Sequence, residues 1–487
     1  MIRKKILKDS GSDKESDKKG IEFSKEKNFS EWYTQVVQKA EMADYAPIKG
    51  FMIIRPNAYR IWEKIQEYFN EVIRKKGVKN AYFPLLIPDE FFKKEAKHAE
   101  GFAPELAYIK NTEEGELLAI RPTSETIMYD SYSKWIRSWR DLPLKINQWC
   151  NVVRWEVKQT KPFIRTREFL WQEGHCVFSS KKEADENMNE MILEYQKLLK
   201  DLLAIPAFVG RKSQKERFPG ADTTMTLEAL MPDGRALQCG TSHNLGQNFA
   251  KTFDVKYLGK DGKSSYAWQT SWGFSTRLIG ALIMIHGDNH GLVLPPRVAE
   301  NKIVIVPIMF DDSKKDVLKK AREIEERLER FGCILDEREE YKPGFKYNEW
   351  EMKGIPIRIE VGPLDIKKGT VVLVRRDTSE KSVVEIDNLE EIVKKTLEDI
   401  QKNLYDKAKK FIDNNVVEVD SLREMKEQIA KGKIVRAYFT DSPEIEDEIK
   451  FESDGATSRI VEDVKKSGVC IKTGKKTNTI GYFAKSY

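Results

Sequence analysis

Two β-rich runs, residues 145–156 and 168–178, constrain the fold of this chain most strongly. They are joined by a polar, basic loop with the sequence KQTKPFIRTR. Because successive side chains of a strand point to opposite faces, Trp171, Glu173 and His175 are expected on one face of the second run. That face combines an apolar wall, a carboxylate and an imidazole, which together suit a small amphipathic cation. Taken singly, a histidine such as His175 is more often an ordinary structural residue.

Helical and extended segments surround these runs and indicate a mixed α and β region. Apolar residues at helical spacing predict one helix over about 57–76, ending at Gly77, and another over 183–203. The inward face of the second helix comprises Met188, Met191, Ile192, Tyr195, Leu198 and Leu199. Further expected elements are an extended run over 80–87, β-rich runs around 227–230 and 235–239, and a buried apolar helix over 274–285.

The length of 487 residues predicts two to four domains. The pattern changes near Pro295–Pro296, after which strands and helices alternate as in a compact α/β module. A long helix is expected over about 388–414. The predicted division is a mobile charged tail at 1–26, a mixed α and β domain at 27–300, an α/β domain at 301–402 and a C-terminal domain at 403–487.

Composition excludes several classes of protein. Hydrophobic residues make up 40% and charged residues 33%, as in globular proteins. The net charge of +6 is compatible with a polyanionic partner without requiring one. Five scattered cysteines without a Cys-x-x-Cys pair argue against a disulfide framework or a zinc ribbon and predict a reducing cytoplasm. We find neither a signal peptide nor an apolar run long enough for a membrane span.

Two motifs offer groups for a charged small molecule. In the stretch RPTSE, Thr123 and Glu125 lie two residues apart and would point the same way on extended chain, offering acceptors to an ammonium group. A surface loop is the simpler interpretation of that motif alone. In the stretch RWE, Arg154 and Glu156 would lie on the same face of a strand. From there Arg154 can donate two hydrogen bonds to a phosphate, and Glu156 can accept one from an adenine amino group. A cross-strand ion pair on the surface is the alternative.

A nucleotide site in this chain must be built on strands and arginines. The sequence holds no GxxxxGK[ST], no GxGxxG and no Ser-His-Asp arrangement. Arg277 is expected in the first turn of the apolar helix, where the helix dipole also favours a terminal phosphate. Phe169 can stack on a base.

The order of these motifs resembles that of class II aminoacyl-tRNA synthetases. The stretch from Gly77 to Pro84 resembles motif 1, Arg154–Glu156 with Arg165–Phe169 resembles motif 2, and Arg277 resembles motif 3. The stretches RPTSE, FLWQEGH, QCGTSH and QTSWGFSTR are similar to those of prolyl-tRNA synthetases of the archaeal and eukaryotic type. The resemblance covers roughly residues 30–487.

This resemblance implies a fold and a reaction. The fold is an α+β catalytic core, an antiparallel sheet with flanking helices, followed by an α/β anticodon-binding domain and a small α+β C-terminal domain. The reaction uses ATP with Mg²⁺ to convert L-proline to prolyl-adenylate and then charges tRNA(Pro). A cytoplasmic homodimer is also implied, with the motif 1 helix and the strand ending at Pro84 at the subunit contact.

The resemblance also assigns roles to individual residues. Charge stabilisation during catalysis is expected from Arg154 and Arg277. Proline binding is expected from Thr123, Glu125, Arg154, Trp171, Glu173, His175 and His243. ATP binding is expected from Arg154, Glu156, Arg165, Thr166, Phe169, Gln238, Thr241, Ser275 and Arg277. Gln238 is also expected near the Mg²⁺ that accompanies ATP. Anticodon binding is expected from Lys346, Lys353 and Arg358, with Tyr347 and Trp350 for packing or stacking; a solvated face is the alternative for each of these.

Two features of relatives are predicted to be missing. Many relatives close the C-terminal domain with four cysteines around Zn²⁺, but Thr440, Ile445 and Lys472 stand at three of these positions and Cys470 at the fourth. Structural zinc needs four Cys or His ligands, so none is predicted. The core is instead expected from Ile429, Ala437, Tyr438, Phe439, Ile449, Val469, Ile471, Ile480 and Phe483.

An inserted editing domain is also not expected, because the interval between His175 and Gln238 already contains a helix and leaves no room for a further domain of at least ~50 residues. Two alternatives to the main interpretation are a threonyl-type synthetase and an inactive, synthetase-like tRNA-binding protein. The first uses a zinc in its amino-acid pocket, and the second usually loses an arginine of motif 2 or 3.

Overall fold

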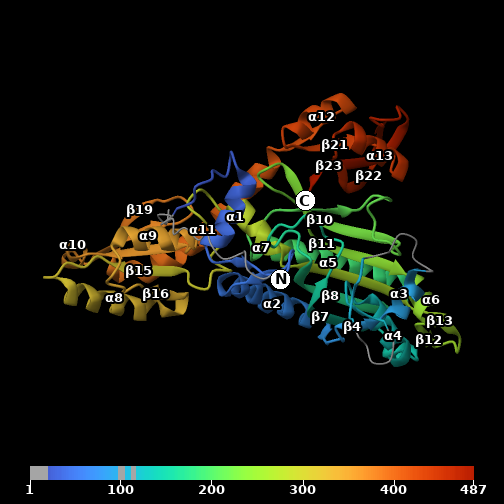
Figure 1. Ribbon diagram of the computed structural model, residues 1–487, viewed down its shortest axis with the longest axis horizontal. Helices are drawn as coiled ribbons and strands as arrows, with labels where there is room; N and C mark the ends of the chain where they lie inside the picture. Colours follow the sequence, from blue (N-terminus) through green and yellow to red (C-terminus); the bar gives the residue numbers. More distant parts are fainter. Residues whose placement is uncertain (1–19, 97–104, 111–116) are drawn as a thin grey trace, which may run out of the picture.

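The computed structural model describes residues 20–96, 105–110 and 117–487. Three lobes are visible in Figure 1. The central lobe holds the green strands, an α/β lobe (residues 303–413, yellow to orange) extends to the left, and the C-terminal region (residues 416–487, orange to red) lies at the upper right. Within the described residues, no helix is both long and apolar enough to cross a membrane.

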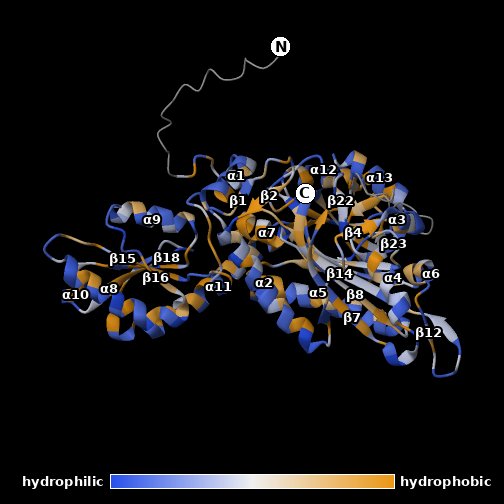
Figure 2. Ribbon diagram, turned by 60° about the horizontal axis from the view of Figure 1, so that its bottom comes forward, coloured by the Kyte–Doolittle hydropathy of each residue, from blue (hydrophilic) through white to orange (hydrophobic). Residues whose placement is uncertain are grey.

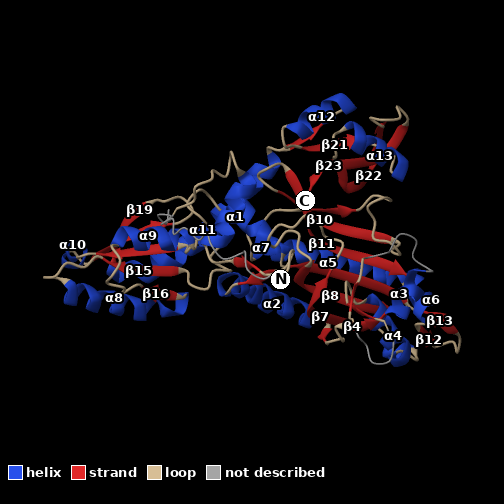
Figure 3. Ribbon diagram, viewed as in Figure 1, coloured by secondary structure: helices blue, strands red, loops and turns tan. Residues whose placement is uncertain are grey.

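One large sheet of 11 strands runs through the central lobe and continues into the C-terminal region (Figure 3). The long strands of its centre pair in antiparallel fashion, with β8 between β7 and β14 and β11 between β14 and β10. In sheet order the strands are β20 (Val416–Glu418), β21 (Ile434–Tyr438), β23 (Lys476–Ser486), β22 (Thr457–Val469), β9 (Phe208–Arg211), β10 (Thr223–Leu230), β11 (Arg235–Gly246), β14 (Trp268–Ser275), β8 (Glu168–Phe178), β7 (Leu144–Val153) and β3 (Lys79–Asn80).

Helices cover one face of this sheet. They are α1 (Phe29–Lys39), α2 (Pro56–Lys75), α5 (Lys181–Asp201) and α7 (Arg277–His286). All six residues predicted for the inward face of α5 are buried. Alternation along the strands sends Cys176, Trp272 and Phe274 into the same core. Figure 2 shows α7 as a largely hydrophobic helix, whereas α2, α5 and α8 also carry hydrophilic residues.

The opposite face of the sheet is only partly covered. Helices α4 (Glu125–Trp135) and α6 (Asn248–Phe253) pack at one end of this face, where Tyr129, Val177 and Leu245 share a smaller core. A short sheet lies beside them, built from β4 (Leu86–Pro88), β6 (Leu118–Ile120) and β5 (Ala107–Tyr108), with α3 (Asp89–Ala96). The hairpins β1 (Ala43–Tyr45) with β2 (Met52–Ile54) and β12 (Lys256–Leu258) with β13 (Ser264–Tyr266) complete the lobe.

The α/β lobe has its own sheet, and its core also includes Ala204 and Val293 of the central lobe. Its strands, in sheet order, are β16 (Cys333–Leu335), β15 (Ile303–Pro307), β17 (Ile357–Val361), β18 (Thr370–Arg375) and β19 (Lys381–Glu385). Its helices are α8 (Lys314–Leu328), α9 (Pro343–Met352), α10 (Pro363–Lys367) and α11 (Leu389–Asp413). The alternation of strand and helix agrees with the predicted α/β module.

The C-terminal region extends the central sheet, a continuity that was not predicted. Strand β22 pairs with β9 at Val461 and Arg211. Strand β23 also pairs in parallel with β11, where Arg235 lies opposite Lys485. The helices α12 (Leu422–Ala430) and α13 (Pro443–Glu452) complete the region.

Most of the predicted C-terminal core is buried, including Phe439, Ile449 and Phe483. Tyr438 and Ile471 are half-buried. The exception is Val469, which is 59% exposed near the end of β22, so its inclusion in the core was wrong.

Three expectations about local structure need correction. Of the predicted mobile tail, residues 1–19 lie outside the described residues, but residues 20–26 are docked, because Lys25 donates to the carbonyl of Ile285 at the end of α7. The extended run 80–87 forms strand only at its two ends, in β3 and β4. Phe274 belongs to β14, and the helix begins at Arg277.

Candidate active site

A cavity of about 420 Å³ opens on the partly covered face of the central sheet. Its floor is formed by β8, β10, β11 and β14, and its walls come from the segments that precede α4 and β10. The predicted site residues that line it are Thr123, Glu125, Arg154, Glu156, Phe169, Trp171, Glu173, His175, Gln238, Thr241, His243, Ser275 and Arg277. Residues from five separate segments of the chain therefore converge on one site.

Two predicted nucleotide-binding residues do not line this cavity. Arg165 is exposed in the loop between β7 and β8. Thr166 is buried, and its hydroxyl donates to the backbone carbonyl of Glu168 at 2.6 Å. In this structure both residues lie beside the site rather than within it.

Arg154 and Glu156 do not share a strand face, so that prediction was wrong. Strand β7 ends at Val153, and Trp155 and Glu156 form a turn. Arg154 nevertheless reaches the cavity, where its guanidinium carbon lies 5.3 Å from the centre of the Phe169 ring and 5.7 Å from that of Trp171. Burial lowers the pKa of Arg154, but a guanidinium stays protonated in proteins. A fixed positive charge thus sits against two aromatic rings.

Thr123 and Glu125 also meet in a way that differs from the prediction. They are not on extended chain, because Glu125 is the first residue of α4 and Ser124 precedes it. The Thr123 hydroxyl donates to the Glu125 carboxylate. The start of a helix, rather than strand alternation, brings the two side chains together at the cavity.

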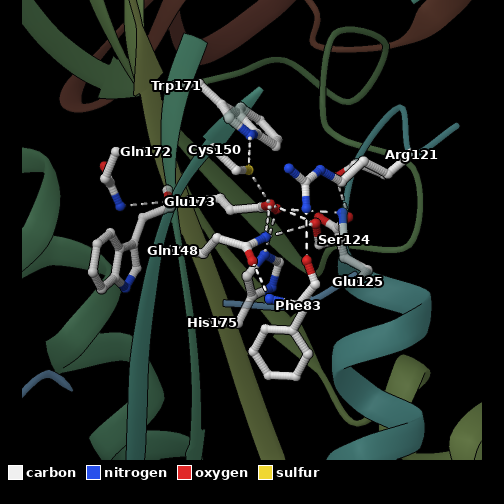
Figure 4. A network of polar contacts seen from close by, with 12 residues as sticks. Phe83, Arg121, Ser124, Glu125, Gln148, Cys150, Trp171, Gln172, Glu173 and His175 are labelled. Carbon is white, nitrogen blue, oxygen red and sulfur yellow. Dashed lines mark hydrogen bonds and ion pairs between the residues drawn. The ribbon is translucent and has the colours of Figure 1, made fainter. Parts of the chain in front are cut away.

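Glu173 is the centre of a buried network of polar contacts (Figure 4). Its carboxylate accepts from the Ser124 hydroxyl at 2.5 Å, from Gln148 Nε2 at 3.0 Å and from Cys150 Sγ at 3.4 Å. Burial alone would raise the pKa of Glu173, but the hydrogen bonds from His175, Ser124 and Gln148 outweigh it and lower the pKa. The structure therefore holds an ionised carboxylate inside the protein.

His175 lies between this carboxylate and a buried tyrosine. Its Nε2 is 3.0 Å from Glu173 Oε2, and its Nδ1 is 3.0 Å from the Tyr129 hydroxyl. Burial opposes protonation, yet Glu173 and Glu125 raise the pKa of His175 above its usual value. One ligand atom from each of Glu125, Glu173 and His175 lies within 4.8 Å of the others. These three side chains could hold a cation, either a metal ion or an ammonium group.

His243 is held in its neutral form on the neighbouring strand β11. Its Nδ1 is 2.9 Å from the Thr224 hydroxyl. Burial, followed by the charges of His175 and Lys212, lowers the pKa of His243 to about 3. A neutral imidazole carries one donor and one acceptor, so His243 can position a ligand without adding charge.

Sequence reasoning missed four residues of the site. Ser124 and Gln148 support Glu173, as described above. Ser271 lies on β14 in register between His175 and His243, and its hydroxyl has no hydrogen-bond partner among the described residues. Strand alternation from Ser275 within the stretch QTSWGFSTR would have found it. Lys212 lines the cavity from the segment after β9, and no sequence signal pointed to it.

Arg277 opens α7, as predicted, and ties two parts of the site together. Its Nε donates to the carbonyl of Ile164 at 3.0 Å, and its Nη1 donates to the carbonyl of Gln238 at 3.2 Å. Ile164 belongs to the loop between β7 and β8. The guanidinium is therefore fixed at the helix N-terminus, where the dipole adds to its attraction for an anion.

The oxygen ligands for a hard cation lie near this arginine. Gln238 and Thr241 both line the cavity from β11, and Glu156 adds a carboxylate from the turn after β7. Mg²⁺ prefers oxygen ligands, and in many nucleotide-binding enzymes the substrate phosphates complete its coordination. The donor set therefore fits Mg²⁺ that arrives with a nucleotide.

The three predicted anticodon residues lie in the α/β lobe with their charges neutralised. Lys346 is buried, and its ammonium donates to the carbonyl of Asp336 at 2.9 Å, so it offers no charge to solvent here. Arg358 is buried against Glu351 and Glu360. Lys353 is partly exposed and pairs with Glu349 at 3.0 Å.

Cys470 and Thr440, at positions where the resemblance implied zinc ligands, are joined by a hydrogen bond. Cys470 Sγ accepts from the backbone N–H groups of Thr440 at 3.3 Å and Thr473 at 3.4 Å. Lys472 pairs with Glu448 and Glu452. Within residues 20–96, 105–110 and 117–487, the only group of three potential ligand side chains with converging atoms is the one in the cavity.

Comparisons with known proteins agree with the arrangement of the lobes. Residues 108–286 match the tRNA synthetase class II core domain (G, H, P, S and T), residues 302–396 match an anticodon binding domain, and residues 422–487 match the C-terminal domain of prolyl-tRNA synthetase.

Relatives match over nearly the whole chain. A proline–tRNA ligase of Alkaliphilus oremlandii is 50% identical over 469 residues, covering 95% of this chain and 97% of that protein. One of Cenarchaeum symbiosum is 46% identical, covering 96% of this chain and all of that protein. The crystal structure of prolyl-tRNA synthetase from Cryptosporidium parvum, complexed with halofuginone and AMPPNP, superposes with a TM-score of 0.91 at 42% identity and covers 96% of this chain and 97% of that chain.

Proposed function

The chain belongs to the prolyl-tRNA synthetases of class II, and we propose that its cavity binds proline and ATP side by side. The enzyme activates L-proline and transfers it to tRNA(Pro). In the first step, a proline carboxylate oxygen attacks the α-phosphorus of ATP, the bond to the β-phosphate breaks, and diphosphate leaves. In the second, a hydroxyl of the 3′-terminal ribose of tRNA attacks the prolyl carbonyl carbon, and AMP leaves.

The observation that carries the proposal is the polarity of the cavity. One end holds Glu125, Glu173 and His175 beside the Trp171 ring. Proline has a secondary ammonium with two N–H donors and an apolar ring, so the carboxylates of Glu125 and Glu173 would accept its N–H groups while Trp171 packs on the ring. His175 would line the pocket and orient Glu173. Neutral His243 and Thr123 complete this end. The negative charge of the pocket favours an ammonium ion over a neutral group.

The other end of the cavity suits the nucleotide. Arg154 lies where the carboxylate of proline and the α-phosphate of ATP would meet, and charge develops there in the transition state. Arg277 would bind the γ-phosphate, Phe169 would stack on adenine, and Glu156 would accept from its amino group. Ser275 would contact ATP beside Arg277. Gln238 and Thr241 would lie near the phosphates, the ribose and the accompanying Mg²⁺, which neutralises phosphate charge.

Arg165 and Thr166 stay predictions as ATP contacts. Arg165 is exposed outside the cavity, so a contact with ATP requires its loop to close over the nucleotide. No side chain needs to act as a general base, because the proline carboxylate is itself the nucleophile. Catalysis then rests on positioning and charge stabilisation.

ATP–diphosphate exchange, measured separately with each of the twenty amino acids, tests this function. We expect exchange that depends on Mg²⁺-ATP and is strongest with proline. Exchange driven by threonine would support a threonyl-type enzyme instead, and no exchange with any amino acid would support an inactive tRNA-binding protein. Both motif arginines are retained, which argues against the inactive alternative.

We further propose that the enzyme carries no editing activity of its own. The segment between β8 and β11 forms α5, β9 and β10, all of which pack in the central lobe. A pocket built for proline excludes the smaller alanine only weakly. The enzyme is therefore expected to form Ala-tRNA and to leave it intact, and rapid deacylation of pre-formed Ala-tRNA by the pure protein would contradict this.

The remaining parts of the chain have proposed roles in tRNA binding and assembly. We assign catalysis to residues 27–300, anticodon binding to 301–402 and support of the site to 403–487. Lys353 and Arg358 are the anticodon contacts that we retain, provided that they exchange their carboxylate partners for RNA. Changing the guanines of a proline anticodon should weaken charging sharply, whereas equal charging of an anticodon-less minihelix would contradict the assignment.

A homodimer is proposed for the assembly. Exposed aromatic and aliphatic side chains near α2 and the hairpin before it support a subunit contact there; they are Tyr45, Ile53, Tyr59 and Tyr82. Sedimentation at twice the chain mass of 56.5 kDa is expected. We also propose that the enzyme works in the cytoplasm and that its C-terminal region holds no structural zinc.

A further inference from the structure

One wall of the cavity is a loop that the C-terminal region holds in place. The pocket loop, defined as residues 212–219, connects β9 to β10. Its cavity-lining members are Lys212, Glu216, Arg217, Phe218 and Pro219. The Phe218 ring lies 4.7 Å from the His243 ring, centre to centre. The loop therefore covers the end of the cavity that we assign to proline.

The start of the pocket loop is bound by acidic residues of the C-terminal region. Arg211, which immediately precedes the loop, pairs with Asp441 at 2.6 Å and with Asp463 at 2.8 Å. The same Asp441 accepts from the backbone N–H of Gln214 at 3.0 Å. Lys215 pairs with Asp447. These contacts fix the backbone immediately before the residues that face the cavity.

A buried ionic cluster connects the same two parts of the molecule. Glu228 of β10 is 2% exposed and accepts from Lys212 Nζ at 2.9 Å. Arg459 of β22 donates to both carboxylate oxygens of Glu228, at 3.0 and 3.2 Å. Burial alone would raise the pKa of Glu228, but Lys212 and Arg459 lower it. Glu228 therefore has two basic partners, Lys212 from the pocket loop and Arg459 from β22.

Removing Arg459 would leave Glu228 with Lys212 Nζ and the Thr226 hydroxyl as its partners. The carboxylate would lose the three hydrogen bonds that hold it from β22, and it can then shift toward Lys212, its remaining basic partner. Lys212 is the first residue of the pocket loop, so any such shift moves the loop directly. The connection therefore runs from the C-terminal region through Glu228 to the cavity wall.

We infer that Arg459 is a positioning residue for the proline end of the site, acting through Glu228 and Lys212 on the pocket loop. The acidic contacts from Asp441, Asp447 and Asp463 support the same loop. The C-terminal region thus contributes to amino-acid binding although none of its residues lines the described cavity. This inference rests on the proposed assignment of the cavity to proline and ATP.

The test uses the full-length enzyme and proline-dependent ATP–diphosphate exchange. Arg459→Met removes the charge, and Arg459→Lys keeps it. We expect Arg459→Met to raise KM for proline about 10-fold while KM for ATP changes less than about 2-fold, and Arg459→Lys to restore part of the loss. The matched control is Arg436→Met, because Arg436 lies in the same region, pairs with Glu418 and does not line the cavity. This control should behave as wild type.

Two further measurements separate positioning from general stability. Asp447→Asn changes an exposed carboxylate and is expected to raise KM for proline about 2- to 3-fold without lowering the melting temperature. Phe218→Ala removes the loop residue at His243, so Arg459→Met should have a smaller effect in that background than in wild type.

Several outcomes would overturn the inference. One is an Arg459→Met enzyme that melts earlier but keeps the wild-type KM for proline. Another is full additivity of Arg459→Met with Phe218→Ala. If Arg459→Met does not fold, unchanged KM values in both Asp447→Asn and Arg459→Lys would be decisive against it. Absence of exchange in the wild-type protein would instead contradict the proposed function.

Discussion

The α/β lobe and the C-terminal region are attached to the central lobe in different ways. The α/β lobe has a separate five-stranded sheet, and it meets the central lobe through side chains and backbone. Arg376 donates to Asp288, after α7, at 2.6 and 2.7 Å, the N–H of Leu292 donates to the carbonyl of Met352 at 3.0 Å, and Ala204 and Val293 pack into the core of the lobe. The C-terminal region shares the sheet of the central lobe and places Arg459 in a buried cluster behind the cavity. The α/β lobe shares no strand pairing with the catalytic sheet, whereas the C-terminal region is part of that sheet.

The two attachments also differ in how much they contribute to stability. Asp288 in the first attachment is 42% exposed, and partly solvated pairs contribute little, typically about 0–1 kcal/mol. In the second attachment, removing Glu228 would leave Lys212 and Arg459 buried together without a carboxylate, which costs on the order of 3–5 kcal/mol. The comparison therefore predicts that adenylate formation depends on the C-terminal region far more than on the α/β lobe.

The largest expected loss of activity comes from a substitution in the cavity itself. Arg154→Ala should lower proline-dependent diphosphate exchange and tRNA charging together, by about 10²–10³-fold, the usual effect of losing one transition-state charge donor. Kinetic assays of both steps check this. The control is Arg140→Ala, which changes an exposed arginine outside the cavity. Near-normal exchange in the Arg154 variant would contradict its role.

A smaller effect is expected at the point where β23 meets β11. Tyr487 donates its backbone N–H to the carbonyl of Ala236 at 3.2 Å, and its ring lies 5.3 Å from Lys161 Nζ. A chain that stops at Ser486 loses both contacts and should show exchange reduced about 10-fold, the effect of one or two hydrogen bonds. Tyr487→Phe keeps both contacts and should retain most activity; equal losses in the two variants would show that only the hydroxyl matters.

The attachment of the α/β lobe should affect only the step that needs tRNA. Arg376→Met removes the ion pair with Asp288, one of the contacts that hold the lobe beside the end of α7, so the lobe is held less firmly there. Diphosphate exchange should stay within about 2-fold of wild type, while the rate of tRNA charging should fall about 5-fold, at the low end of coupling between distant sites. A larger loss in exchange than in charging would show that the α/β lobe supports adenylate formation more than it supports tRNA charging.

The smallest expected effect is that of a chelator. Cys470 Sγ already accepts two backbone N–H groups, and Lys472 is paired with two glutamates, so the C-terminal region has no need of a metal to close its turn. EDTA should leave the melting temperature unchanged, and zinc measured after dialysis should be well below one ion per chain. Stoichiometric zinc that survives dialysis would contradict this prediction.

Local patterns in the sequence predicted the parts of the site that depend on local geometry. Alternation placed Trp171, Glu173 and His175 on one face, and the apolar run after Arg277 marked the start of α7. The prediction failed where regular structure ends, because Arg154 follows the last residue of β7 and Glu125 begins α4. Both side chains reach the cavity, but through a turn and a helix start.

These local patterns could not predict which distant segments of the chain pair with each other. Nothing in the residues around Arg459 indicates a carboxylate on β10 as its partner, and nothing around Val461 indicates pairing with β9. Such contacts depend on which edge of the central sheet is free. The overall likeness to the synthetases could be established from motifs, whereas the shared sheet required the structure.

The position of β22 and β23 in the chain has a consequence for synthesis on the ribosome. The strands β9, β10 and β11 emerge early, and β22 and β23 emerge only after the whole α/β lobe has been made. Until then β9 lacks its outer neighbour, and an unpaired strand edge is a place where nascent chains associate wrongly. The α/β lobe can fold before β22 has been made, but the cavity wall at Lys212 is completed only when Arg459 of β22 has been synthesised and has paired with Glu228. Translation that stalls before this point should therefore leave a chain that is both incompetent for proline activation and prone to aggregate.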